Sequence, residues 1–76
     1  MDIDVGAREI LRTLERKHFW GTKVTTIDTL RNHFCKGVIT FDSSLSTLIE
    51  KRLIMESGYG VSLNLKMKHQ INKYVN

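Results

Sequence analysis

Apolar residues near the start of the chain recur at the spacing of an amphipathic helix. They occupy positions i, i+3, i+4 and i+7 and therefore share one helical face: Ala7, Ile10, Leu11 and Leu14. Asp2 or Asp4 can cap this helix, because a carboxylate at the N-cap accepts hydrogen bonds from unpaired backbone N–H groups. The pattern predicts that the helix ends near Lys17 or His18.

Two further helices are predicted in the middle of the chain. The stretch GTKVTT, residues 21–26, is rich in β-branched side chains and favours a brief extended segment. Thr25 or Thr26 begins the second helix, Gly37 ends it, and Thr40 or Asp42 opens the third. The residues predicted to face inward are Ile27, Leu30 and Phe34 in the second helix, then Phe41, Leu45, Leu48, Ile49 and Arg52 in the third.

The stretch LIMESGYGVSLNL, residues 53–65, has the pattern of a β-hairpin. Two runs rich in Leu, Ile and Val flank a turn of Ser, Gly, Tyr and Gly at residues 57–60. We expect the hairpin to cover the open side of the three helices, with the extended segment near Val24 adding a third strand. A last amphipathic helix is predicted from the spacing of Met67, Ile71 and Val75, with Tyr74 beside them.

The segments TLIEKRLI, residues 47–54, and ESGYGVSLNL, residues 56–65, carry a helix directly into a hairpin. With the order of the elements, they make the region from Ile10 to Leu65 resemble the winged-helix family. The resemblance implies an α+β fold in one domain over residues 1–76, with a three-helix core, a C-terminal β-hairpin wing and a further C-terminal helix. It also implies binding of double-stranded DNA in transcriptional or replication control, with the third helix in the major groove and the wing on the backbone.

The resemblance also implies which side chains would face the nucleic acid. Serine and threonine hydroxyls can donate to phosphates or base edges, lysines add charge, and a tyrosine at the tip of the wing can reach a phosphate. The implied nucleic-acid-binding residues are Lys36, Ser43, Ser44, Ser46, Thr47, Lys51 and Tyr59. Two structural roles stay open beside this one: the serines can simply cap the helix, and the tyrosine can shield the sheet.

Other features of the same face favour a protein-interaction module that binds no nucleic acid. The outward side of the third helix has no Arg, Asn or Gln for bidentate base contacts, and Glu50 lies near its centre. The predicted wing has no Lys or Arg between Met55 and Leu65. If DNA is bound, we expect a homodimer or a weaker mode that uses Lys23, Arg31, Lys36 and Lys51.

Composition places the chain among small globular proteins. It has 76 residues, 41% of them hydrophobic, and a formal net charge of +4, which is compatible with a polyanionic partner. The basic excess is concentrated in the last eleven residues, which contain Lys66, Lys68, His69 and Lys73 and no acidic residue. The sequence predicts no secretory signal and no membrane span, so we expect a cytoplasmic, intracellular protein. Whether the chain is complete or part of a larger protein stays open.

The sequence gives no sign of an enzyme. Cys35 is the only cysteine, which excludes an internal disulfide, and its spacing to His33 fits no paired zinc-ligand pattern. No nucleophile–base pair, paired carboxylates or phosphate-binding glycine motif is present, so we expect no catalysis, metal, cofactor or small-molecule substrate. Phe19 and Trp20 are expected to fill the core beside the first helix, although Trp20 can instead anchor a partner.

Overall fold

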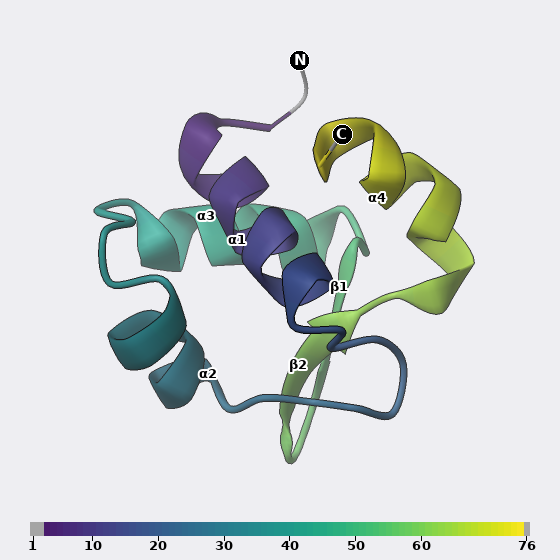
Figure 1. Ribbon diagram of the computed structural model, residues 1–76, viewed down its shortest axis with the longest axis horizontal. Coiled ribbons are helices and arrows are strands. Elements are labelled where there is room, and N and C mark those ends of the chain that lie inside the picture. The colour runs from purple at the N-terminus through teal and green to yellow at the C-terminus, as the bar shows by residue number, and fades with distance from the viewer. Residues whose placement is uncertain (1–2, 76) are drawn as a thin grey trace.

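The computed structural model describes residues 3–75, and its elements follow the predicted order (Figure 1). The elements are α1 (Val5–Arg16), α2 (Ile27–Thr29), the π-helical turn η1 (Leu30–Phe34), α3 (Phe41–Glu50), β1 (Ile54–Ser57), β2 (Gly60–Leu63), the 3-10 turn η2 (Leu65–Met67) and α4 (Lys68–Val75). Helices and one antiparallel hairpin therefore share a small α+β domain, as the sequence predicts. In the part of the chain that the structure describes, no helix is long and apolar enough to cross a membrane.

Helix α1 lies at the centre of the fold and packs against α3, α4 and β2. Its predicted apolar face is buried, and Ile10, Leu11 and Leu14 have no exposed surface. The core is completed by fully buried residues from the other helices and from the start of the hairpin: Leu30, Leu48, Leu53 and Ile71. Phe19, Trp20, Met67, Tyr74 and Val75 pack around this core and are half-buried. The predicted inward faces of α1 and of the last helix are thus confirmed.

Strand β2 is hydrogen-bonded along both of its edges. On one edge it pairs antiparallel with β1, from Ile54 opposite Leu63 to Ser57 opposite Gly60. On the other edge the N–H of Val61 donates to Thr25 O at 2.8 Å, and the N–H of Leu63 donates to Phe19 O at 2.8 Å. The predicted third strand is therefore reduced to isolated bridges at Trp20 and Thr25.

A polar link joins the start of α1 to the first turn of α3. The carboxylate of Asp4 accepts from the N–H of Ala7 at 2.7 Å and from the Ser44 hydroxyl at 3.1 Å. Ser44 is only 1% exposed and also lies 2.9 Å from the hydroxyl of Thr40. The expectation that Ser44 faces nucleic acid is wrong, because this serine bonds α3 to the cap of α1. Of the two predicted caps, Asp4 is the one used, and Asp2 lies outside the described residues.

Two other predictions need correction. The second helix does begin after Thr26, but it continues as η1, where the N–H of Cys35 donates to Leu30 O at 2.8 Å across a wide turn. Arg52 was expected on the inward face of the third helix. It lies beyond the end of α3, exposed, with φ of 63°, and its carbonyl accepts from the Asn64 side chain at 2.8 Å.

Replacing Asp4 with alanine should destabilise the domain, because the change removes an N-cap and leaves the buried Ser44 hydroxyl without this acceptor. We expect a loss of about 1–2 kcal/mol in the free energy of unfolding, measured by urea denaturation. The matched control is Glu9→Ala in the same helix, whose exposed ion pair with Arg12 should be worth about 0.5 kcal/mol or less. Equal losses in the two variants would contradict the assigned link.

The glycines on either side of Tyr59 should differ sharply in their tolerance of alanine. Gly60 has φ of +147°, and a Cβ there would clash with the carbonyl of Thr25, so Gly60→Ala should cost at least about 2 kcal/mol. Gly58 has no positive φ and open space around its Cα, so Gly58→Ala should stay within about 0.5 kcal/mol of wild type. Thermal unfolding of both variants measures the contrast. A Gly60→Ala variant as stable as wild type would contradict the close approach of β2 to residues 20–25.

Candidate functional site

The predicted DNA-contacting residues do not form one basic surface. Ser43 and Ser46 are exposed on α3, and Tyr59 is 84% exposed at the tip of the hairpin. Lys36 and Lys51 are exposed but precede and follow α3, whose ten residues span about 15 Å. The two lysines therefore stand at opposite ends of the helix.

Two hydroxyls of α3, those of Ser43 and Thr47, already have partners in the helix or at its N-cap. Ser43 donates to Thr40 O at 3.2 Å, and the half-buried Thr47 donates to Ser43 O at 3.0 Å. Such bonds to a preceding carbonyl satisfy the donor of each hydroxyl locally. The hydroxyl donors of Ser43 and Thr47 are therefore already used by backbone carbonyls. A hydrogen bond from either hydroxyl to a phosphate would have to replace the bond described here.

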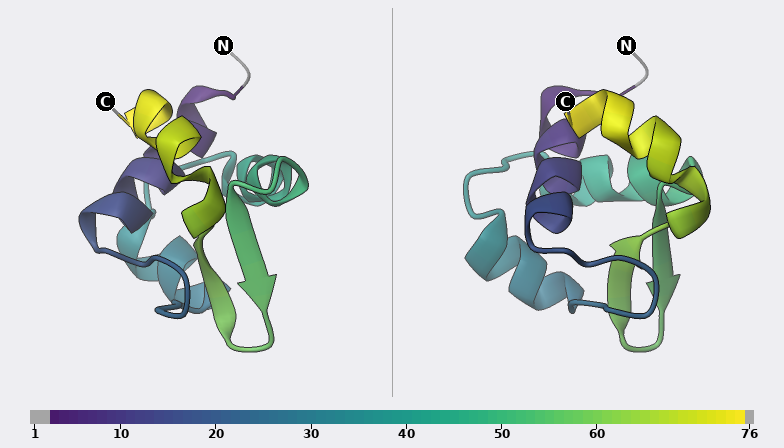
Figure 2. Two further views of the ribbon diagram at one scale, coloured as in Figure 1. Left: turned by 90° about the vertical axis from the view of Figure 1, so that its right-hand side faces the viewer. Right: turned by 45° about the vertical axis from the view of Figure 1, so that its right-hand side comes forward.

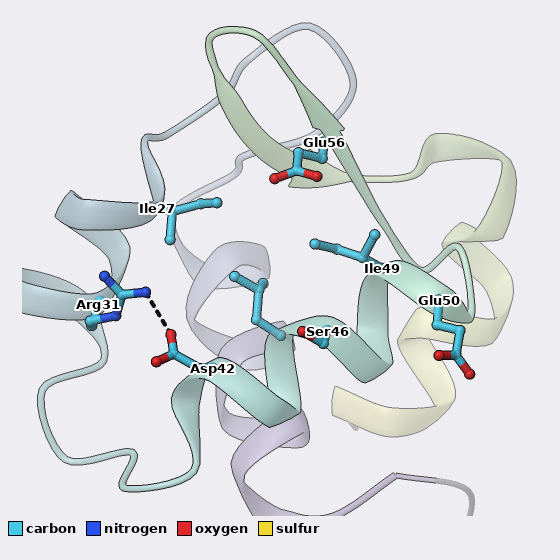
Figure 3. A pocket seen from close by; sticks show the side chains of 8 residues that line it. Ile27, Arg31, Asp42, Ser46, Ile49, Glu50 and Glu56 are labelled. Atoms are coloured by element: carbon cyan, nitrogen blue, oxygen red, sulfur yellow. Dashed lines mark hydrogen bonds and ion pairs between the residues drawn. The ribbon is translucent and has the colours of Figure 1, made fainter.

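A shallow groove crosses the outer side of α3, between α2 and β1 (Figure 3). Its volume is about 420 Å³. Apolar side chains from two helices form the floor, with Leu45 buried and Ile27 and Ile49 half-buried. The polar residues that complete the lining are Arg31, Asp42, Ser46, Glu50 and Glu56. The groove thus combines an apolar floor with a mostly acidic rim.

The single cation in the lining of this groove is held by carboxylates. Arg31 Nη2 lies 2.5 Å from Asp42 Oδ1, and Arg31 Nη1 lies 3.4 Å from Asp28 Oδ1. The guanidinium carbon also lies 5.2 Å from the centroid of the Phe41 ring. Arg31 therefore ties η1 to the first turn of α3, and its charge is matched by two carboxylates.

The groove is acidic although the chain is basic. Its lining has three carboxylates and one guanidinium, a local charge of −2, whereas the whole chain carries +4. Within the described residues Glu50 and Glu56 make no ion pair, and both are exposed. Arg52 and Lys66 line the neighbouring pocket together with these two glutamates. Exposed carboxylates attract cations and repel phosphates, and this effect weakens with salt.

A second groove continues from the first toward the tip of the hairpin. It shares Ile27 and is lined further by Thr26, Asp28 and the turn at residues 57–60. Asp28 adds another exposed carboxylate at this end. Exposed carboxylates therefore extend from α3 to the hairpin turn.

Sequence reasoning missed most of this site. It identified Glu50 on the outer face of the third helix and Glu56 as an acidic residue of the wing, but it took Asp42 only as a possible start of that helix. It also placed Ile27 and Ile49 simply inward. The groove depends on residues from α2, α3 and β1 that become neighbours only after folding. The signal that could have found it was the sign of the charges near the helix-turn-helix, where Asp28, Asp42, Glu50 and Glu56 supply half of the eight acidic residues.

Cys35 has the environment of a structural cysteine. It is 4% exposed, and burial raises the pKa of its thiol, an effect that a hydrogen bond from Thr13 only partly offsets. A raised pKa leaves little thiolate at neutral pH, and thiolate is the nucleophilic form. Among residues 3–75, no three His, Cys, Asp or Glu side chains gather where they could hold a metal ion.

Comparison of the chain with protein-family models, with curated proteins and with solved structures found no match.

Native Cys35 should react slowly with iodoacetamide. Burial and the raised pKa of the thiol should make alkylation at pH 7.5 at least about tenfold slower than in urea. The native rate should keep rising above pH 9, because the raised pKa delays formation of the thiolate. Mass spectrometry of quenched samples measures both rates. Equal rates in buffer and urea would show that the thiol is accessible in the folded domain.

Proposed function

We propose that this chain is a winged-helix protein-interaction module whose α3–β1 groove binds a basic, partly apolar segment of another protein. The observation that carries the proposal is the groove itself, with its apolar floor and its excess of carboxylates. The winged-helix assignment is supported by the packing of α1 on α3, by the helix–turn–helix formed by α2, η1 and α3, and by the hairpin that follows α3 directly.

The floor of the groove gives a partner apolar contact area. Ile27 and Ile49 face the groove and remain half-buried in the free domain, beside the buried Leu45 (Figure 3). An aliphatic side chain that became fully buried on this floor would contribute about 1.5–3 kcal/mol. The exposed parts of the two isoleucines are the apolar surface that a bound segment would cover.

The rim selects the charge of the partner. Glu50 and Glu56 lie on the α3 and β1 sides of the groove, and Asp42 lies near Arg31 at its other end (Figure 3). Lysine or arginine residues flanking an apolar anchor would meet these carboxylates. Complementary charges of this kind raise the rate of association and discriminate against acidic partners.

Duplex DNA is the second candidate partner, favoured by the exposed hydroxyls of Ser43 and Ser46 and by the exposed ring of Tyr59. In this alternative Lys36 and Lys51 would contact phosphates, and a homodimer would double the number of such contacts. Both alternatives are proposed for an intracellular protein. The acidic rim makes the protein partner the better supported one.

Chemical-shift mapping by NMR tests the two partners on the same face. The probes are a helical peptide of leucine and lysine, the same peptide with glutamate for lysine, and a short DNA duplex. We expect the basic peptide alone to shift the backbone amides of Ser46, Ile49 and Glu56. Glu50→Gln and Glu56→Gln should each weaken its binding by about two- to fivefold. The control Glu9→Gln, on α1, should leave binding unchanged.

Two outcomes would contradict this proposal. In the first, the duplex shifts the amides of Ser43, Ser46 and Thr47 while the basic peptide shifts none of them, which would support the DNA alternative. In the second, the basic peptide binds equally well to wild type and to the Glu50→Gln and Glu56→Gln variants, which would locate its site elsewhere.

A further inference from the structure

Three lysines lie over three aromatic rings, two of which belong to the segment that follows α1. The contacts between each ammonium nitrogen and a ring centroid are Lys17 over Phe34 at 4.7 Å, Lys23 over Phe19 at 5.7 Å and Lys68 over Trp20 at 5.9 Å. We call these six residues the lysine–aromatic patch. They come from the end of α1, the segment that follows it, η1 and the start of α4.

The rings of the patch are held firmly by the fold. Phe19 and Phe34 pack with their centroids 6.2 Å apart, and all three rings are half-buried against the core. The backbone on either side of Trp20 is fixed to β2, since Phe19 O accepts from the N–H of Leu63 and the N–H of Gly21 donates to Leu63 O. The rings thus rest on a rigid base, and flexible lysine side chains cover them.

The segments that form the patch contain no acidic residue. Residues 16–25, 30–36 and 64–75 include neither Asp nor Glu. Within the described part of the chain, Lys17, Lys23 and Lys68 make no ion pair with a carboxylate. These lysines therefore have no carboxylate of residues 3–75 within ion-pair distance, in contrast to Arg31 in the acidic groove.

The patch and the acidic groove are built from different residues, although η1 supplies Phe34 to the patch and Arg31 to the groove. In the left view of Figure 2, the segment after α1 lies on one side of the hairpin and α3 lies on the other. The arrangement follows from β2, which bonds to β1 along one edge and to residues 19–25 along the other. None of the six residues of the patch is among those that line the groove.

We propose that the lysine–aromatic patch binds single-stranded nucleic acid. Phosphates would lie between Lys17, Lys23 and Lys68, and a base would stack on Trp20 after the flexible Lys68 side chain moves aside. Alternation of ammonium groups with aromatic rings matches the alternation of phosphates and bases along a single strand. The proposal does not depend on the function assigned to the acidic groove.

The rings distinguish a single strand from the other polyanions that this charge attracts. The bases of a duplex are stacked on each other, so a duplex would use only the lysines of the patch. An acidic peptide would likewise gain from the lysines but would offer no flat bases to stack on Trp20. A single strand uses both kinds of side chain and should bind more tightly than either.

Trp20 is the only tryptophan of the chain and reports directly on the patch. Titration with a dT oligonucleotide of about twelve nucleotides should quench its fluorescence. Three phosphate contacts predict a salt slope of about −2, which is a loss of roughly 20-fold in affinity between about 50 and 200 mM salt. Lys17→Ala, Lys23→Ala and Lys68→Ala should each reduce the slope by about 0.7.

Arg12→Ala on α1 and Arg52→Ala beyond the end of α3, which remove exposed cations outside both the patch and the groove, are the matched controls and should leave affinity and slope unchanged. Far-UV circular dichroism establishes that every variant is folded. The proposal is overturned if dT leaves the fluorescence and the backbone amide shifts unchanged, or if the control variants weaken binding as much as the patch variants. It is also overturned if a matched duplex or poly-glutamate binds as tightly as dT, since the rings would then contribute nothing.

Discussion

The bonding of β2 along both edges is the constraint on which the rest of the structure depends. Val61, Ser62 and Leu63 are all buried, and the Ser62 hydroxyl donates to Gly21 O at 2.7 Å. Because β1 takes one edge and residues 19–25 take the other, the strand holds the hairpin against the segment that follows α1. Gly60 makes this approach possible, since any side chain there would meet the backbone of Thr25.

The fold carries two surfaces of opposite charge. One is the groove formed by α2, η1, α3 and β1, with an apolar floor and an acidic rim. The other is formed by segments without acidic residues, which bring lysines over half-buried rings. The net charge of +4 does not reveal this difference, because it is the sum of the charges on both surfaces. In the two proposals, the groove takes the protein partner and the patch takes the nucleic acid.

Local patterns predicted most of the elements, because helix faces and a two-residue hairpin turn are encoded by neighbouring residues. The errors have tertiary causes. Ser44 faces inward because its partner Asp4 lies forty residues earlier in the chain, which no helical spacing reveals. Arg52 leaves the helical face because α3 ends at Glu50 and the chain turns into β1. The groove was missed because Ile27 and Glu56, which are far apart in the sequence, line the same groove only in the folded domain.

The separation of charge can be measured directly by paramagnetic relaxation of backbone amides with a cationic and an anionic nitroxide. The ratio of the two effects reports the electrostatic potential near each amide. The account predicts that the cationic probe is favoured at Ser46, Glu50 and Glu56, and that the anionic probe is favoured at Phe19, Trp20 and Lys23. Equal ratios on the two surfaces, or an anionic preference along α3, would contradict it.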